Sequence, residues 1–347
     1  MRFLATPALA FCLTVQTAIP SMFSESPSRV ETLATTTTRN ISHMAEVRDD
    51  VHLHYLDWGG RGPTVLLLAG LGDTAYIFAE AAPTLTTSYR VLALTRRGYG
   101  QSDVTQRGYG IQDRIEDIRA FCDKLQLSKI ILVGHSAAGD ELTAFAQKYP
   151  DRLLGLLYLD AAYDRSDPAT PKPHMDAWQN VLAQMYGGLS EDQTYASRDA
   201  RRRALQNLFH ANYGVRWNEA LESNFIETTT KNADGSLSPR TPGWVPDSIR
   251  QGVPTTRLEI PYRSIPTLLV FARGRLENQQ FRIPDTQALA VIEKDEDDYE
   301  AYFEAYVRQL RLKEPGPRIE ILPKDRHYFF LHDPESLGRL LHDLSSE

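Results

Sequence analysis

The sequence predicts an α/β protein with a mostly parallel central sheet that helices cover on both faces. Short apolar runs alternate with helical patterns between residues 51 and 159, and this alternation is typical of βαβ units. Two of the runs, Thr64–Leu68 and Ile130–Val133, are continuously apolar. Strands that are buried on both faces of a sheet have this composition. We therefore expect these two strands in the middle of the sheet.

The composition is that of a folded protein with a substantial core. Of the 347 residues, 42% are hydrophobic and 24% are charged, which is enough apolar material for one large core or two small ones. The formal net charge of −7 gives no indication of binding to nucleic acid or to an anionic membrane surface. We expect a small, neutral and partly apolar organic substrate instead.

The N-terminal segment resembles an export signal. In residues 1–21, the positive charge of Arg2 precedes a mostly apolar run that is too short to span a bilayer. We expect a secreted or periplasmic protein; the alternative is a cytoplasmic protein with a disordered tail. Residues 22–45 have few large apolar groups and are expected to form a flexible tether. No later stretch is long and apolar enough for a transmembrane helix, so no stable membrane insertion is expected.

The remaining elements follow in chain order and divide the folded part into a core and an insertion. Strands are predicted at residues 51–58, 64–68, 90–94, 130–133, 153–159, 267–272 and 318–322, and core helices at 115–125, 297–312 and 335–344. Between them, residues 163–262 have two helical patterns, at 176–186 and 196–210, and a Pro-, Gly- and Ser-rich segment at 232–254. We assign residues 46–162 and 263–347 to the core, and residues 163–262 to a helical cap.

The strongest local motif lies after the strand that begins at Ile130. The chain continues as Gly134-His-Ser-Ala-Ala-Gly139 and then enters a helix. A serine in this strained strand-to-helix turn exposes its hydroxyl above the sheet edge, provided that the residues two before and two after it are small. Gly134 and Ala138 satisfy this requirement, although the usual residue at position 138 is glycine. Ser136 is thus the candidate nucleophile; the alternative is an ordinary turn in which Ser136 caps the helix.

Two backbone amides are candidates for stabilising an oxyanion. The N–H of Ala137 lies at a helix N-terminus, where the helix dipole favours negative charge. A second donor is expected from the glycine-rich loop 69–73, and Leu71 is the best candidate. The alternative for this loop is a simple tight connection.

Three segments in this order resemble the α/β-hydrolase superfamily across nearly all of residues 51–344. They are the turn around Ser136, the pair Ala69-Gly70 where many relatives have His-Gly, and residues 96–103, which are similar to the relatives' Arg-Gly-x-Gly-x-Ser. The resemblance implies an α/β-hydrolase fold with a general base in the loop after the last strand. His327 occupies that place and is preferred to His332.

The resemblance leaves the acid of the triad open. Relatives often have an aspartate after the penultimate strand, but Arg275 occupies the aligned position, and Glu277 is the nearest carboxylate. Some members, including haloalkane dehalogenases, take the acid from the end of the strand after the nucleophile helix, where this chain has Asp160. We prefer Asp160 to Glu277, whose expected role is an ion pair with Arg273 or Arg275. The alternative role for Asp160 is to cap a turn.

These residues predict a serine hydrolase that acts on a carboxylic ester through an acyl-enzyme on Ser136, with no metal and no organic cofactor. His327 would act as base, Asp160 would orient it, and the amides of Leu71 and Ala137 would hold the oxyanion. The alternatives are hydrolysis of an amide or carbon–carbon bond, or a receptor-like protein that binds a ligand without turnover. A group of cap residues is expected to contribute to a pocket over the serine: Trp178, Met185, Tyr186, Phe209, Tyr213, Trp217 and Phe225.

Overall fold

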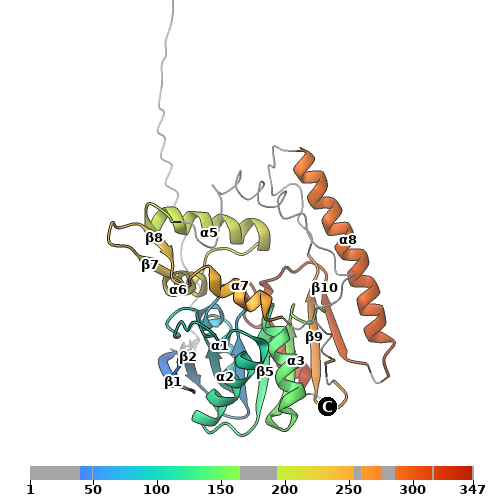
Figure 1. The fold of residues 1–347 in the computed structure, drawn as a ribbon. Coiled ribbons are helices and arrows are strands. Elements are labelled where there is room, and N and C mark those ends of the chain that lie inside the picture. The colour runs from blue at the N-terminus through green and yellow to red at the C-terminus, as the bar shows by residue number, and fades with distance from the viewer. Residues whose placement is uncertain are drawn as a thin grey trace, which may run out of the picture. The chain divides into compact units, whose positions relative to one another are not determined.

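An eight-stranded sheet is the centre of the computed structural model (Figure 1). The structure describes residues 40–48, 50–164, 194–253, 259–260, 262–274, 286–314 and 316–345. These residues all belong to one of the two units into which the chain divides, Thr37–Glu347. The strands are β1 (Ile41–Glu46), β2 (His52–Gly59), β3 (Thr64–Leu68), β4 (Arg90–Leu94), β5 (Ile130–His135), β6 (Leu153–Leu159), β9 (Thr267–Ala272) and β10 (Arg318–Leu322).

The order of the strands in the sheet is β1-β2-β4-β3-β5-β6-β9-β10. From β4 to β10 every pair of neighbours is parallel, and only the pairs β1·β2 and β2·β4 are antiparallel. The prediction of a mostly parallel sheet is confirmed. The two continuously apolar strands, β3 and β5, are neighbours inside it, as expected.

The predicted boundary of the tether is wrong at its C-terminal end. Residues 41–46 form strand β1, which pairs with β2 from Ile41↔Asp57 to Glu46↔His52. Most of β1 is exposed because it is an edge strand, so it lacks the apolar run that marks the inner strands. The rest of the tether and the expected signal, residues 1–39, lie outside the described residues.

Helices cover both faces of the sheet, as predicted. Successive residues of a strand point to opposite faces, so Leu66 belongs to one hydrophobic cluster and Leu67 to the other. The first cluster includes residues of α2 (Ile111–Lys124), α3 (Ala138–Lys148) and α8 (Thr286–Arg311). The second includes residues of the 3₁₀ helix η1 (Ala75–Phe78), α1 (Ala82–Leu85) and α9 (Ser336–Leu344).

Helix α8 begins earlier than predicted. The expected start was residue 297, but the helix extends back to Thr286. The added part, 286–296, contains the first four residues of the charged run 293–298. Glutamate and lysine favour helix without forming an apolar stripe, so the periodic pattern marked only the second half of the helix.

The cap contains more regular structure than the sequence indicated. Its described elements are α5 (Arg198–Tyr213), α6 (Glu219–Glu227), a hairpin of β7 (Thr229–Lys231) and β8 (Leu237–Pro239), and α7 (Trp244–Gln251). Helix α5 matches the pattern at 196–210, whereas the predicted helix 176–186 lies outside the described residues. The segment 232–254 is not an irregular loop, because β8 and α7 lie within it. Pro246 is in the first turn of α7, where proline's missing N–H breaks no helical hydrogen bond.

Cap helix α6 packs against η1 at the sheet's carboxyl edge. Asn218, before the helix, donates to Glu80 Oε2 at 3.0 Å, and Asn224 donates to Asp73 Oδ1 at 2.8 Å. These contacts join the cap to the core through side chains of both.

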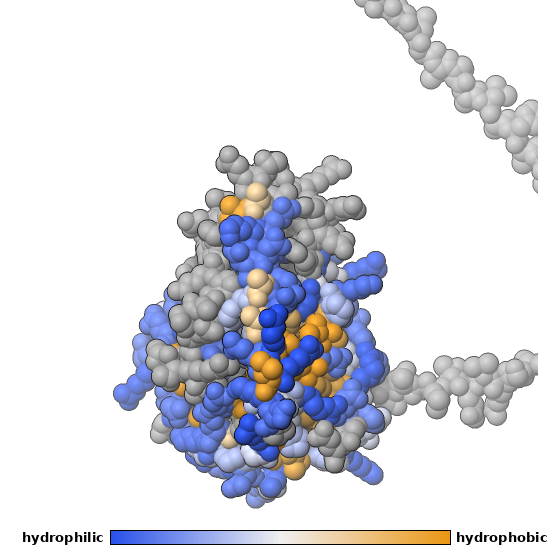
Figure 2. Space-filling model, turned by 90° about the vertical axis from the view of Figure 1, so that its right-hand side faces the viewer, coloured by the Kyte–Doolittle hydropathy of each residue, from blue (hydrophilic) through white to orange (hydrophobic). Residues whose placement is uncertain are grey.

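The surface shown in Figure 2 is largely hydrophilic, with hydrophobic side chains in small patches between the polar ones. Among the helices that the structure describes, none combines the length and the apolar character that a membrane-spanning segment requires.

Candidate active site

Ser136 and Asp160 follow neighbouring parallel strands, so they meet at the carboxyl edge of the sheet. Ser136 comes after β5, and Asp160 comes after β6. The Ser136 amide donates to Leu159 O at 3.1 Å, and the Asp160 amide donates to Val270 O at 2.8 Å. Each backbone is therefore held by a carbonyl of the next strand.

Both residues adopt the left-handed backbone region that side chains disfavour. The φ angle is +55° at Ser136 and +48° at Asp160. Such a conformation costs on the order of 1–3 kcal/mol in a non-glycine residue and is concentrated at functional sites. Nothing in the sequence indicated that Asp160 would share this strain with Ser136.

Small residues let the chain turn sharply around Ser136. A Cβ atom on Gly134 would lie 2.4 Å from Leu142 Cδ1, and one on Gly139 would lie 1.8 Å from the carbonyl oxygen of Ala161. Ala138 is fully buried. Gly139 is thus required more strictly than Gly134, because its clash is with backbone atoms, whereas Gly134 faces the end of a flexible leucine side chain. The motif did not reveal this requirement because Ala161 belongs to the segment after β6. No side chain caps α3, so Ser136 does not play the alternative role of a helix cap.

The loop after β3 runs directly against the turn that contains Ser136. A Cβ atom on Gly70 would lie 3.1 Å from Ser136 Cβ. Arg96 holds this loop, since it donates to Ala69 O at 3.1 Å and to Gly70 O at 3.2 Å. Glu141 in turn binds Arg96 at 2.7 Å. Although burial opposes ionisation, the guanidinium of Arg96 and that of Arg114 hold the pKa of Glu141 below its usual value.

The two candidate oxyanion donors are available for a ligand. Within the part of the chain that the structure describes, neither the Leu71 nor the Ala137 amide donates to a protein group. Leu71 follows the two residues whose carbonyls Arg96 holds, and Ala137 follows Ser136 at the start of α3. Backbone amides that are held in place before the reaction are suited to stabilise negative charge on an oxygen.

Asp160 and His327 are brought together as an acid–base pair. Asp160 Oδ2 lies 2.6 Å from His327 Nδ1, and the side chain of Asp160 is only 8% exposed. Its other oxygen, Oδ1, accepts from the Tyr163 hydroxyl at 2.6 Å and from the Ala272 amide at 3.1 Å. Burial, together with the neighbouring carboxylate, raises the pKa of Tyr163 well above its usual value, so Tyr163 remains a neutral donor.

His135, the residue before the serine, positions the segment that contains the base. His135 Nε2 donates to the carbonyl oxygen of His327 at 3.0 Å, and the two rings lie 4.4 Å apart between centroids. Burial and the neighbouring His327 lower the pKa of His135 well below its usual value. No sequence motif indicated this role of His135. In the described part of the chain, Ser136 Oγ and His327 do not share a hydrogen bond; such contacts often form only when the substrate is bound.

The other candidate histidine, His332, lies apart from this pair. His332 Nε2 lies 3.0 Å from Asp325 Oδ1 near the surface. Glu277 and Arg275 lie outside the described residues, and Arg273 forms an ion pair with Glu300. Among the described residues, no three His, Cys, Asp or Glu side chains are arranged to hold a metal ion.

A second buried carboxyl group links the core, the base loop and the cap. Asp73 accepts from Tyr328 Oη and from Asn224 Nδ2, both at 2.8 Å. Asn224 Oδ1 accepts from the Thr74 amide at 2.9 Å. Burial raises the pKa of Asp73, partly opposed by the hydrogen bonds from Tyr328 and Asn224. Asp73 and Asn224 are 151 residues apart, so no local motif could have predicted their contact.

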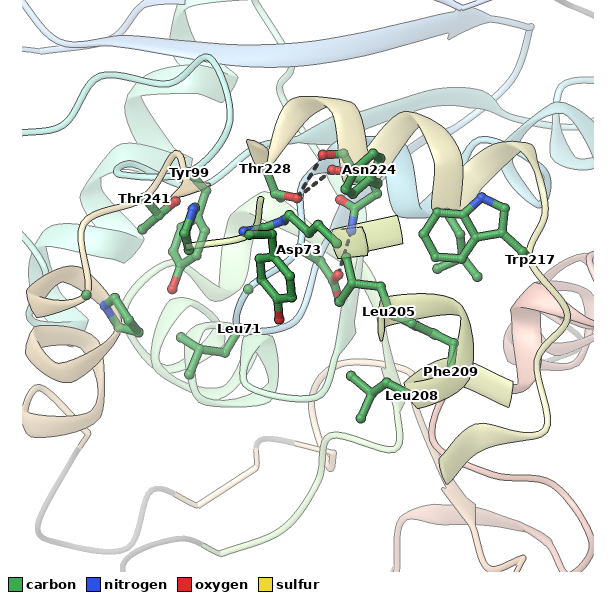
Figure 3. Close-up of a pocket in the computed structure, with 18 of the residues that line it drawn as sticks. Leu71, Asp73, Tyr99, Leu205, Leu208, Phe209, Trp217, Asn224, Thr228 and Thr241 are labelled. Atoms are coloured by element: carbon green, nitrogen blue, oxygen red, sulfur yellow. Dashed lines mark hydrogen bonds between the residues drawn. The ribbon is translucent and has the colours of Figure 1, made fainter. Parts of the chain in front are cut away.

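A cavity of about 360 Å³ lies between the cap and the loop that contains Leu71. Figure 3 shows Leu71 and Tyr99 on one side of Asp73 and Trp217 on the other.

Of the cap aromatics expected in a pocket, Phe209, Trp217 and Phe225 line the cavity. Tyr213 packs on Tyr328 instead, with ring centroids 4.7 Å apart. Trp178, Met185 and Tyr186 lie outside the described residues. Leu71 lines the cavity, but Ser136 does not, so the cavity is beside the serine rather than directly over it.

Comparison with known proteins shows similarity to several hydrolases. Mouse (Mus musculus) "Epoxide hydrolase 4" is 34% identical over 113 residues, which is 32% of this chain and 32% of the relative. The "2-hydroxy-6-oxononadienedioate/2-hydroxy-6-oxononatrienedioate hydrolase" of Escherichia coli strain K12 is 29% identical over 141 residues, or 39% of this chain and 49% of the relative. The chain therefore matches between a third and a half of the length of these curated relatives.

The solved structures support the fold. The crystal structure of E-2-(acetamidomethylene)succinate hydrolase matches with a TM-score of 0.63 at 20% identity, covering 89% of this chain and all of that chain. The family model described as "alpha/beta hydrolase fold" matches residues 63–254. Because this match covers more than half of the 347 residues, the chain belongs to the alpha/beta hydrolase fold family, and the resemblance on which the sequence analysis relied is confirmed.

Proposed function

We propose that the protein is a serine hydrolase that cleaves a carboxylic ester through an acyl-enzyme on Ser136. The observation that carries this proposal is the 2.6 Å contact between Asp160 Oδ2 and His327 Nδ1 at the sheet edge where Ser136 also lies. In this contact His327 Nδ1 carries the proton, which leaves Nε2 free to accept one. A histidine held in this form is a suitable base for activating a serine hydroxyl.

The reaction follows from these roles. Ser136 Oγ attacks the ester carbonyl while His327 Nε2 takes its proton, and the amides of Leu71 and Ala137 stabilise the resulting oxyanion. The C–O bond to the alcohol then breaks, and His327 returns the proton to the leaving alkoxide. Water then attacks the acyl carbon while His327 Nε2 takes one of its protons. The bond between that carbon and Ser136 Oγ breaks, His327 returns the proton to Ser136 Oγ, and the acid leaves. Asp160 stays ionised throughout and stabilises the imidazolium.

The identity of the residue after β5 supports an ester substrate over an epoxide. In the family, epoxide hydrolases and dehalogenases form their ester intermediate on an aspartate, whereas position 136 is a serine. An acyl-enzyme on serine is the expected intermediate for an acyl substrate. Amides and activated carbon–carbon bonds are the other substrates that this chemistry permits.

The test is labelling with a fluorophosphonate probe, followed by peptide mapping and by a screen of p-nitrophenyl esters of graded chain length beside the corresponding amides. We expect one adduct, on Ser136, and ester hydrolysis that falls by roughly 10⁴-fold or more in Ser136→Ala. A folded protein with no adduct on Ser136 and no turnover would instead support the ligand-binding alternative. Faster cleavage of amides than of matched esters would contradict the ester assignment alone.

A further inference from the structure

One face of helix α5 carries a charged residue where an apolar one is expected. Arg201, Leu205, Leu208 and Phe209 all line the cavity. Residues three, four and seven positions apart lie on one face of a helix, so Arg201 continues the stripe formed by the other three. Arg203, two positions further along, is exposed on a different face.

Arg201 is buried without a carboxylate partner. The residue is 8% exposed, and its Nε atom makes no hydrogen bond. Its guanidinium lies over the ring of Tyr195, 5.6 Å from the centroid. No carboxylate in the described part of the chain forms an ion pair with it. Burying a charge in this way is unfavourable unless another group compensates it.

The nearby arginines and acids are already paired. Arg198 and Arg202, on the same helix, both bind Glu222. Asp73 lines the same cavity, but its oxygens accept from Tyr328 and Asn224. Burial lowers the pKa of Arg201 from its usual value, yet a guanidinium remains protonated at neutral pH. Arg250, which also lines the cavity, forms an ion pair with Asp247, so among the described residues Arg201 is the lining arginine that has no carboxylate partner.

We propose that Arg201 binds a carboxylate of the substrate, so that the preferred substrate is an acyl ester with a second, ionised carboxyl group at the far end of an apolar chain. A guanidinium presents two parallel N–H donors to a carboxylate, and its single charge matches that group better than a phosphate dianion. The placement of the reacting carbonyl at Leu71, which lines the same cavity, rests on the function proposed above. This proposed substrate is anionic, whereas the net charge of the sequence favoured a neutral one.

The test compares two esters of equal chain length, mono-p-nitrophenyl adipate and p-nitrophenyl hexanoate, which differ in a terminal carboxylate or methyl group. We expect the wild type to prefer the adipate ester by about 10- to 100-fold in kcat/KM. Arg201→Met should abolish that preference and change hexanoate turnover by less than about threefold. Arg201→Lys should retain part of the preference, and Arg203→Met, on the exposed face of the same helix, should retain all of it.

An equal loss for both esters in Arg201→Met, or a wild-type preference for hexanoate, would overturn the proposal. If neither ester is hydrolysed, the proposed function is wrong. A measurement of adipate binding then tests the carboxylate site independently of catalysis. Calorimetric titration of Ser136→Ala with adipate should then show binding that is lost in the variant that also has Arg201→Met. Absence of that binding, or tighter binding of butylphosphonate than of adipate, would refute the assignment of a carboxylate.

Discussion

The carboxyl edge of the sheet and the cap hold their functional side chains in different ways. At the edge, the amides of Ser136 and Asp160 donate to carbonyls of neighbouring strands, so backbone geometry fixes the candidate catalytic groups. In the cap, Leu205 and Trp217 line a cavity with their side chains, and side-chain contacts place them, including the hydrogen bond from Trp217 Nε1 to Glu222 Oε2. Because of this difference, we expect the carboxyl edge of the sheet to control whether any bond is cleaved. We expect the cap to control which molecule is bound.

The largest effect is expected from the acid at the sheet edge. In Asp160→Asn, the amide can no longer hold the histidine as a carboxylate does, so the base adopts the wrong tautomer. We expect kcat/KM to fall by roughly 10⁴-fold for every ester, long or short. Steady-state kinetics would measure the loss, and circular dichroism would show that the variant is folded.

Glu277→Gln is the matched control for that experiment. It removes the competing carboxylate and should change kcat/KM by less than about tenfold. The opposite pattern, an inactive Glu277→Gln and an active Asp160→Asn, would transfer the role of acid to Glu277. It would also contradict the comparison, because Asp160, whose backbone the neighbouring strand holds, would then not supply the acid.

An intermediate effect, limited to large substrates, is expected from the cavity wall. The indole of Leu205→Trp would occupy part of the 360 Å³ cavity, so p-nitrophenyl octanoate should lose about tenfold in kcat/KM while the acetate changes by less than about twofold. Asn207→Trp, at an exposed position on the same helix, should leave both esters unchanged. Equal losses for both chain lengths in Leu205→Trp would show that the cap also controls the chemical step.

The smallest effect concerns Asp73, where the two regions meet, and it appears in stability. Because the pKa of Asp73 is raised in the folded state, the folded protein keeps a proton that the unfolded chain releases above about pH 4. The stability that wild-type Asp73 contributes is therefore full at low pH and declines as the pH rises toward the folded-state pKa. Asp73→Asn has no such proton. The difference between its urea midpoint and that of the wild type should therefore shift in favour of the variant as the pH rises from 4.5 to 8. A constant difference between the two midpoints would show that Asp73 ionises normally.

Much of the sheet was predictable, and the reason is local. Strands β3 and β5 are buried on both faces and therefore have continuous apolar runs, and the turn at Ser136 requires small residues close to it in the chain. The pairing of Asp160 with His327 was anticipated only through the resemblance to a family in which strand ends meet at one edge. Topology predicts which strand ends are neighbours at the edge of the sheet. It does not predict the positive φ of Asp160.

The features that sequence reasoning missed depend on contacts between distant segments. No sequence motif indicated that Asn224 joins the cap to the core, because its partners Asp73 and Thr74 are far away in the chain. Arg201 is one of several arginines in a polar helix, and its sequence neighbours do not distinguish it from the others. The structure shows that it faces a cavity. Gly139 and His135 lie within the motif itself, yet their roles come from Ala161 and His327, which the motif does not contain.

The position of the cap in the chain has a consequence for how this protein could diversify. Leu159, at the end of β6, is in register with Val270 of β9, so the segment that contains the cap leaves and re-enters the core between two adjacent strands. Loop-closure entropy grows slowly with length, by about 0.6 kcal/mol for each doubling. Changes in the length of the segment between these strands would therefore cost the core little, as long as the contacts of Asn218 and Asn224 with the core are kept. Natural selection can therefore vary the length of the cap, while the Asp160 amide keeps its partner Val270 O and the Asp160 carboxylate keeps its contact with His327 on the sheet.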